Sequence, residues 1–389
     1  MSVFWRVVWR EVGIISHRPL LWIATIGVPL FSALFMTTIF GNGAIQEIPI
    51  GVVDDSFTAI SRDIVRTIDS SPTINITHRY TSSSEALAAV RDREIYGYVV
   101  LPHDLTRNMV CGTRSTIPYY YHYAFMSIGA QVESTLRTLL TMASLDPIIV
   151  TANEMGVSER QIMAFLEPLN SDIHPLGNAS LNYRTYLAEP FFFIMFQIII
   201  LITTVYVLGS EKSHSKEWLA TANSNIFTAL AGKLLPYAFA FIASGIAALY
   251  VMYGIKGLAP LELYGSLWGL VAAMLGLVVA SISLALFTYS LFPNMTIVLS
   301  AVSMIGSLGA TLSGITFPIA SMHPIFHYVA LILPIRHFTL IVQNQLYTEG
   351  SYGVVWLHAA ILGAYCLLPL LTASHLHKSI ISGNYEKIE

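Results

Sequence analysis

Residues Pro190–Leu208 have the sequence PFFFIMFQIIILITTVYVL, without a single charged side chain. At 1.5 Å per residue a helix of this length covers about 28 Å, close to the roughly 30 Å of hydrocarbon in a bilayer. Five other runs have similar length and character: Leu20–Phe40, Leu230–Tyr253, Tyr264–Leu291, Met295–Phe317 and Val354–Ala373. The pattern predicts a mostly α-helical integral membrane protein with six transmembrane helices.

The composition agrees with a membrane protein and excludes other classes. Of the 389 residues 54% are hydrophobic and 11% are charged, whereas soluble domains carry about 25% charged residues. The formal net charge is −3, and the chain has no basic patch of the kind that binds a phosphate backbone, so we expect no nucleic-acid partner. The two cysteines, Cys111 and Cys366, stand in different surroundings and predict no disulfide.

A basic segment precedes the first apolar run. As a helix, it gathers its apolar side chains on one face, at Phe4, Trp5, Val8, Val12 and Ile15. Its basic side chains fall on the opposite face, at Arg6, Arg10 and His17. Such a helix lies in the headgroup plane of a membrane, so residues 1–18 predict an N-terminal amphipathic helix that continues into a first transmembrane helix at 19–40.

Orientation follows from the positive-inside rule. Arg6, Arg10 and Arg18 place the N-terminus in the cytoplasm, and an even number of spans returns the tail at 377–389 to the same side. The polar loop at 210–229 is then cytoplasmic as well. Residues 41–188 are expected outside, as a domain inserted between the first two spans.

That inserted region alternates strand and helix signals. Four strand-like runs are IPIGVVD (48–54), NITHRY (75–80), YGYVVLP (96–102) and IPYYYHY (117–123). Helical patterns fall at 59–68, 84–91, 103–109, 127–144 and 158–169. Because helices separate most of the strands, the region predicts a compact extracytoplasmic α/β domain with parallel strands.

The segment 320–346 is apolar but unlike the six spans. It contains Pro324 and Pro334, and Arg336 stands near its middle. An arginine at the centre of a span costs about 2.5–3.5 kcal/mol, so we expect a re-entrant or interfacial segment. His323 and His327 have metal-ligand spacing on a helix, but no third ligand stands nearby, and we expect no metal site.

No catalytic or nucleotide-binding motif occurs in the chain: GxxxxGK[ST], HExxH, GxSxG and CxxC are all absent. The sequence therefore predicts neither an enzyme nor a bound cofactor. Two readings remain for the polar loop at 210–229, a solvated connection or a docking helix whose apolar edge begins with Trp218 and Leu219. Glu189, at the outer mouth of the second span, is either an interfacial residue or part of a substrate path.

Four stretches resemble the ABC-2-type permeases of ABC transporters, in the exporter subgroup with a large external domain between the first and second transmembrane helices. The N-terminal basic helix resembles the elbow helix of that family. The loop at 210–237, SEKSHSKEWLATANSNIFTALAGKLLPY, has the acidic segment, the Thr/Ser turn and the GK-L ending of that family. Residues 312–322, LSGITFPIASM, resemble its signature after the fifth span. The start of the inserted region, IPIGVVDDSFTAI, resembles its external domain.

The resemblance implies roles for particular residues. The basic N-terminal helix would be an elbow helix that uses Arg6 and Arg10. Coupling to the ATPase would involve Glu211, Lys212, Glu217, Trp218, Leu219, Gly232 and Lys233. The translocation path would include Glu189, Phe193, Phe196, Ser313, Gly314, Phe317 and Pro318.

The resemblance also implies partners and a location. A second permease copy or paralogue would complete a dimer, and cytoplasmic ABC ATPase subunits would hold ATP and Mg and hydrolyse the nucleotide. A periplasmic adaptor is a further candidate partner, and the location would be the bacterial cytoplasmic (inner) membrane. The aromatic path favours amphipathic or lipid-like cargo, drugs among them. The alternative is a membrane-anchored sensor or structural protein whose external domain binds a ligand.

Overall fold

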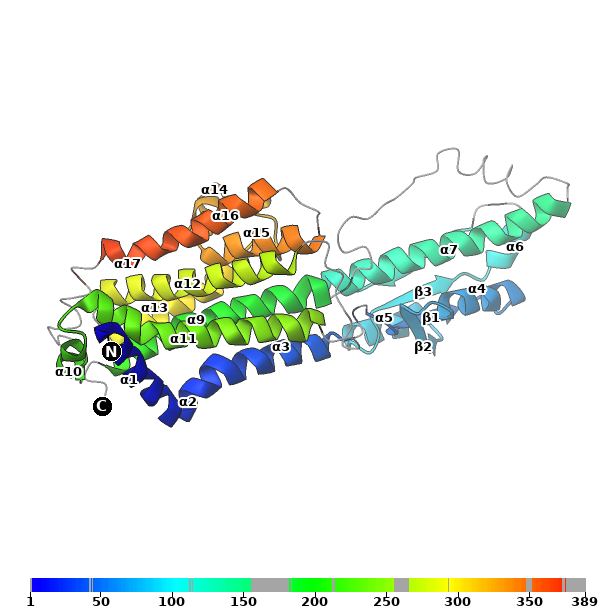
Figure 1. Ribbon diagram of the computed structural model, residues 1–389. Coiled ribbons are helices and arrows are strands. Elements are labelled where there is room, and N and C mark those ends of the chain that lie inside the picture. The colour runs from blue at the N-terminus through cyan, green and yellow to red at the C-terminus, as the bar shows by residue number, and fades with distance from the viewer. Residues whose placement is uncertain are drawn as a thin grey trace. The chain divides into compact units, whose positions relative to one another are not determined.

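The computed structural model describes residues 2–41, 43, 45–111, 113, 115–154, 182, 184–211, 214–254, 266–292, 294–347, 352–372 and 375. The chain divides into two compact units (Figure 1). The membrane unit comprises Met1–Ala44 and His174–Glu389, and the inserted unit comprises Ile45–Ile173.

The inserted unit contains a four-stranded sheet in the order β2-β1-β3-β4. Its strands are β1 (Ile48–Asp54), β2 (Ile74–Tyr80), β3 (Gly97–Leu101) and β4 (Tyr119–Tyr121). β1 is parallel to both β2 and β3, and β4 is antiparallel to β3. The predicted strands are therefore confirmed, and so is parallel pairing for β1, β2 and β3. For β4 that expectation was wrong, since a helix at Leu105–Val110 stands between β3 and β4 in the chain and yet the two strands pair antiparallel.

Helices cover both faces of this sheet: α4 (Ala59–Asp69), α5 (Ser83–Arg91), α6 (Leu105–Val110) and α7 (Met126–Glu154). Alternate side chains of β1 point to opposite faces, so Ile50 and Val52 pack with α4 and α7 while Val53 packs with α5. Thr58 begins α4 with a capping box, accepting a hydrogen bond from the Ser61 amide at 3.2 Å. The helix predicted at 158–169 lies outside the described residues.

Five described helices of the membrane unit are long and apolar enough to cross a membrane: Pro19–Ile39, Tyr186–Ser210, Ile226–Gly254, Leu267–Leu291 and Met295–Leu312. They are built from α2 (Pro19–Trp22), η1 (Ile23–Gly27) and α3 (Val28–Ile39); η2 (Arg184–Ala188) and α9 (Glu189–Ser210); α11 (Ile226–Leu249) and η4 (Tyr250–Gly254); α12 (Leu267–Leu291); and α13 (Met295–Leu312). They correspond to the first five predicted spans.

The last predicted span corresponds to the apolar run Val355–Leu371, which is shorter than these five. It consists of α16 (Tyr352–Ala364), the short η6 (Tyr365–Leu367) and α17 (Leu368–Leu371). Between it and α13 lie η5 (Ile319–Ser321) and a pair of helices, α14 (Pro324–Leu331) and α15 (Pro334–Tyr347), bent by 84°. This bend lies in the segment expected to be re-entrant, and the pair has the geometry of a broken span or a re-entrant loop.

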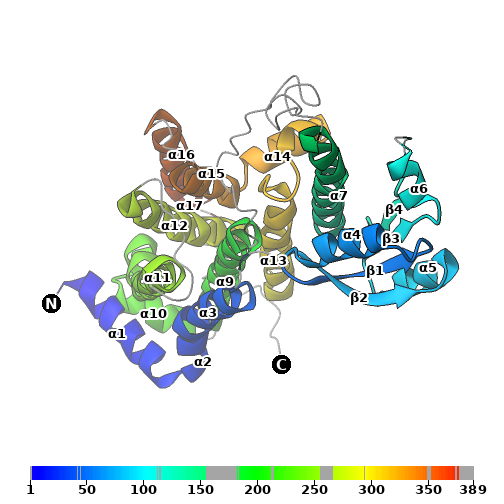
Figure 2. The same cartoon turned by 90° about the vertical axis from the view of Figure 1, so that its right-hand side faces the viewer.

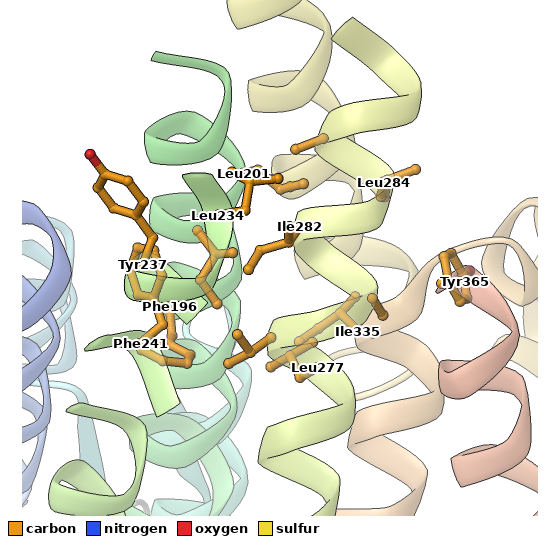
Figure 3. Packing of buried hydrophobic residues seen from close by; sticks show 14 of the residues in the cluster. Phe196, Leu201, Leu234, Tyr237, Phe241, Leu277, Ile282, Leu284, Ile335 and Tyr365 are labelled. Atoms are coloured by element: carbon orange, nitrogen blue, oxygen red, sulfur yellow. The ribbon is translucent and has the colours of Figure 1, made fainter. Parts of the chain in front are cut away.

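The centre of the membrane unit is formed by α9 and α12. Their most apolar windows are 67% buried inside the chain, against 28% for α13. Figure 2 shows α9 almost end-on, with α3, α11, α12 and α13 around it. In the core Phe193 lies against Phe338, with ring centroids 4.7 Å apart. Phe196 lies against Phe241, with ring centroids 6.0 Å apart (Figure 3).

The N-terminal segment forms the predicted helix, α1 (Val3–His17), but its contact face differs from the predicted apolar face. The side chains buried against the protein are Val7, Val8, Glu11 and Ile15. Trp5 and Val12, which belong to the predicted apolar face, are 49% and 37% exposed. The helix therefore uses one apolar edge for packing and leaves another uncovered.

Candidate functional site

A cluster of buried charges joins three elements at one end of the membrane unit. It comprises Arg10 and Glu11 of α1, Glu211 at the C-terminal end of α9, and Lys233 and Tyr237 of α11, and is called the ionic cluster below. These residues are distant in the sequence, as Glu11 and Lys233 are 222 positions apart. The cluster therefore exists only in the folded chain.

Lys233 is the centre of the ionic cluster. Its Nζ donates hydrogen bonds to Glu11 Oε1 at 2.9 Å and to Glu211 Oε1 at 3.0 Å. Arg10 forms a bidentate pair with Glu211, at 2.9 Å from Nη1 to Oε1 and 3.1 Å from Nη2 to Oε2. The Tyr237 hydroxyl donates to Glu11 Oε1 at 2.9 Å. Two carboxylates thus face two cations, and the cluster is neutral as a whole.

Burial makes this pairing necessary. Glu11 is 0% exposed, Lys233 1% and Glu211 6%. A buried charge without a partner costs several kcal/mol, so each of these groups depends on the others. Burial alone raises the pKa of Glu211, but the hydrogen bonds and charges of Arg10 and Lys233 outweigh it and hold that pKa below its ordinary value. For Arg10, burial alone would lower the pKa, but the hydrogen bonds and the charge of Glu211 have the larger effect. The pKa of Arg10 is therefore above its ordinary value. Both groups stay ionised.

Local sequence explains how the cluster assembles. Lys233 and Tyr237 are four residues apart on α11, so both point from the same face of the helix. Just before Lys233, Gly232 lets α1 approach closely. A Cβ atom at Gly232 would lie 2.9 Å from Val7 Cβ and 3.4 Å from the Phe4 carbonyl oxygen. The glycine therefore sets the distance at which α1 delivers Glu11.

The polar loop after α9 contains a short helix, α10 (Ser215–Thr221). Its inner side carries Trp218 and Leu219, which are 1% and 6% exposed. The Trp218 ring lies 5.9 Å from Lys233 Nζ, close enough for a cation–π contact. Its outer side leaves Lys216 and Glu217 exposed. The loop is thus a docked helix rather than a wholly solvated connection.

The turn between α10 and α11 is tightly built. Asn223 and Ser224 have positive φ values of 52° and 62°, in the left-handed region that asparagine tolerates better than most residues. The Ser224 amide donates to Leu219 O at 2.9 Å. Asn225 then caps α11 by accepting from the amides of Phe227 and Thr228, at 3.0 and 3.2 Å. The connection between α10 and α11 is therefore short and held by its own hydrogen bonds.

Six of the residues assigned from the resemblance come together here: Arg10, Glu211, Trp218, Leu219, Gly232 and Lys233. Glu217 is exposed on α10, Arg6 is exposed on α1, and Lys212 lies outside the described residues. Sequence reasoning missed Glu11 and Tyr237. The signal for Glu11 was present, since it is the only acidic residue among positions 1–46.

The residues predicted for the translocation path fall into two groups. Glu189, Phe193 and Phe196 are 1–2% exposed inside the chain's own bundle. Ser313 and Gly314 follow the C-terminal end of α13, where Ser313 O accepts from Arg336 Nη1 at 2.7 Å. Phe317 and Pro318, just beyond, are exposed. Whether they line a path stays a prediction.

Gly314 has a positive φ of 84°, and a Cβ there would lie 2.5 Å from Arg336 Nη1. The glycine therefore lets the half-buried arginine reach the end of α13, which explains how a cation is accommodated in this apolar segment. His323 takes a capping role at the start of α14, with its Nδ1 3.4 Å from the Ile325 amide. No three His, Cys, Asp or Glu side chains of the described residues are grouped so that they could hold a metal ion.

Comparison with known proteins supplies the family. A family model described as "ABC-2 family transporter protein" matches residues 19–375, which takes in all five spans, the inserted unit and α10. No curated protein is similar enough to be named as a relative. Since the match covers more than half of the chain, this multi-pass membrane protein belongs to the ABC-2 family of transporter proteins, and it is the permease of an ABC transporter rather than an ATPase.

Proposed function

We propose that the chain is the permease subunit of an ATP-driven exporter, and that ATPase closure reaches the membrane through α10 and the ionic cluster. ATP and Mg would be held by separate ATPase chains on the cytoplasmic side. The termini and α10 would face the cytoplasm of a bacterium, and the inserted unit would lie on the outer side of its inner membrane. Association with an ABC ATPase is what membership of this family implies.

The observation that carries the proposal is the two-sided construction of α10. Lys216 and Glu217 point outward and are free for a polar partner, whereas Trp218 and Leu219 are buried against the membrane unit. A partner that grips the outer side would move the buried side with it. Trp218 touches Lys233, and Lys233 holds both α1 and the end of α9.

The ionic cluster gives this displacement a defined route. Lys233 ties α11, the third span, to Glu211 at the end of the second span. Arg10 and Glu11 add the elbow helix α1 to the same junction. Buried charges cannot separate without strong penalty, so these elements would move as one body rather than slide past each other.

A second permease copy or paralogue is part of the proposal. The fifth span, α13, has the least covered window of the five, and Ile297, Met304 and Leu308 are exposed on it. A dimer would bring such a surface of each copy to a shared path. The apolar character of these side chains favours amphipathic or lipid-like cargo, drugs included, over ions. A periplasmic adaptor that binds the inserted unit would extend the route.

The test uses the permease purified together with its ATPase. Replacing Glu217, Trp218 and Leu219 by Gly and Ser should leave membrane insertion intact but abolish the stimulation of ATP hydrolysis by the permease. In inside-out vesicles it should also abolish ATP-dependent uptake of a fluorescent phospholipid analogue and of an amphipathic dye. Normal uptake by this variant would refute the coupling role of α10.

Two variants distinguish the outer side of α10, which would bind the ATPase, from its inner side, which packs against the membrane unit. Replacing both Lys216 and Glu217 by Ala should weaken binding of the ATPase about tenfold or more without lowering the unfolding temperature, because surface substitutions change stability by at most about 0.5 kcal/mol. Trp218→Ala removes a fully buried ring and should lower the unfolding temperature as well. If the two variants change ATPase binding and the unfolding temperature equally, then the outer and inner sides of α10 do not have separate roles.

A further inference from the structure

An apolar groove runs along the uncovered edge of α1. It has a volume of about 330 Å³ and lies between α1, the first span at α2 and η1, and the third span at α11. Its walls include Trp5 and Val12 of α1, Trp22 of α2, and Phe239 and Ala240 of α11. A volume of this size lies in the range of small-molecule sites, roughly 300–1,000 Å³.

The few polar side chains in the groove are already satisfied within the chain. Ser16 Oγ donates to Gly13 O at 2.8 Å, and Thr25 Oγ1 donates to Leu21 O at 2.7 Å. The Tyr237 hydroxyl is used by Glu11 in the ionic cluster. An occupant would therefore meet only apolar surface, which fits a hydrocarbon chain and not a polar solute.

The exposed charges of α1 nearest the groove have one sign. Arg6 and Arg18 are exposed on or directly after α1, and Arg6 is next to the wall residue Trp5. The elements that form the walls carry no acidic residue except Glu11, and Glu11 is 0% exposed. The mouth of the groove therefore attracts an anion. Exposed tryptophans such as Trp5 and Trp22 are typical of side chains at the headgroup level.

We propose that this groove binds a resident anionic phospholipid, with an acyl chain between α1 and α11 and the phosphate beside Arg18. α1 contacts α11 through the edge that carries Val7 and Glu11, and its opposite edge is left uncovered. The lipid fills the gap along that uncovered edge. Tyr237 belongs to both sites, since its ring lines the groove while its hydroxyl holds Glu11. In Figure 3 this hydroxyl points away from the other labelled core residues. The bound lipid thereby supports the ionic cluster from the membrane side.

The proposal can be tested without the ATPase, and so independently of transport. The full chain is reconstituted in phosphatidylcholine vesicles, with either Trp5 or Trp9 as its only tryptophan and Phe at the other five positions. Brominated phosphatidylglycerol or brominated phosphatidylcholine is then titrated in, and quenching of the tryptophan fluorescence is measured. Trp9 is the matched control, because it is 62% exposed on the same helix but does not line the groove.

At Trp5 we expect phosphatidylglycerol to be preferred about fivefold over phosphatidylcholine, the factor that corresponds to about 1 kcal/mol for one arginine near a membrane surface. At Trp9 the ratio should be lower than at Trp5, because Trp9 does not line the groove and reports on the surrounding lipid instead. Arg18→Gln should remove the preference at Trp5. Ala240→Phe fills the groove and should lower the quenching of Trp5 but leave that of Trp9 unchanged.

Equal lipid ratios at Trp5 and Trp9 would overturn the proposal, as would a Trp5 signal that Ala240→Phe does not change. Native mass spectrometry of the chain with all six tryptophans gives a second measurement, in case the single-tryptophan chains do not fold. It should show phosphatidylglycerol retained by the wild type and lost from Ala240→Phe. Release of this lipid on adding ATP to the complex with its ATPase would identify it as cargo and would contradict a resident lipid.

Discussion

Lys233 is the residue on which the ionic cluster depends most. Its Nζ is within 3.0 Å of two carboxylates, Glu11 and Glu211, and its side chain is 1% exposed. Without it, Glu11 would keep the Tyr237 hydroxyl and Arg10 Nη1 at 3.8 Å, while Glu211 would keep its bidentate pair with Arg10. The sequence marks Lys233 only as part of a GK-L ending; its burial is a property of the fold.

Lys233→Met should therefore destabilise the membrane unit by about 3–5 kcal/mol, the usual cost of removing one partner from a buried ion pair. Thermal unfolding of the purified chain in detergent measures the effect. Adding Glu11→Gln in the same chain should restore part of the loss, because Arg10, already bidentate with Glu211, would otherwise be the one cation left for two buried carboxylates. Lys216→Met is the control, since Lys216 is exposed on α10 and should change stability by at most about 0.5 kcal/mol.

If Lys233→Met unfolds at the wild-type temperature, Lys233 is not buried between Glu11 and Glu211. If Glu11→Gln makes the variant worse instead of better, then Glu11 is held by other groups than Lys233.

At the scale of elements, the contact between α1 and α11 depends on how closely the backbones of the two helices approach each other. Gly232 faces Val7, which is 0% exposed, and a Cβ at Gly232 would stand 2.9 Å from both the Cβ and the Cγ1 of that valine. Real Cβ atoms do not come so close, so one helix must shift. The same shift would draw Glu11 away from Lys233.

Gly232→Ala should accordingly cost about 1–3 kcal/mol, as overpacking does in other cores. Val7→Ala in the same chain should recover part of this loss, because it removes the Cγ1 that the new methyl group meets. A double-mutant cycle of unfolding free energies measures the coupling, for which about 0.5–3 kcal/mol is usual between residues in contact. Additive effects of the two substitutions would show that α1 and α11 do not touch here.

Gly363→Ala provides the matched control within a helix of the same unit. A Cβ at Gly363 would meet no atom within 4 Å, so this substitution should stabilise α16 by about 1 kcal/mol through helix propensity alone.

Elements were predictable from the sequence where their signals are periodic and long. Uncharged runs predicted the first five spans to within a few residues, and alternating β-branched runs predicted the strands of the inserted unit. The contact face of α1 was not predictable in this way. A helical projection ranks faces by hydrophobicity, and it therefore placed Arg10 on the outside and ignored Glu11. The structure buries Glu11 because Lys233 and Tyr237 meet it, and those partners lie more than 200 residues away.

At the scale of the whole molecule, the spans determine which side of the membrane each part occupies. One span, Tyr186–Ser210, lies between the inserted unit and α10 in the chain. If that span crosses the bilayer, the two flanking parts must lie on opposite sides. The proposed function requires α10 to be on the side of the ATP.

Cysteine labelling tests this arrangement. Ser84 on α5 and Ala220 on α10 are both exposed, and each is replaced by Cys in a chain whose own Cys111 and Cys366 are changed to Ser. In intact cells a membrane-impermeant thiol reagent that reaches the periplasm should label Ser84→Cys and spare Ala220→Cys. In inside-out vesicles the order should reverse, because the cytoplasmic face is now turned to the reagent. Labelling of both positions from one side would mean that the second span does not cross, and α10 would then lose its place beside an ATPase.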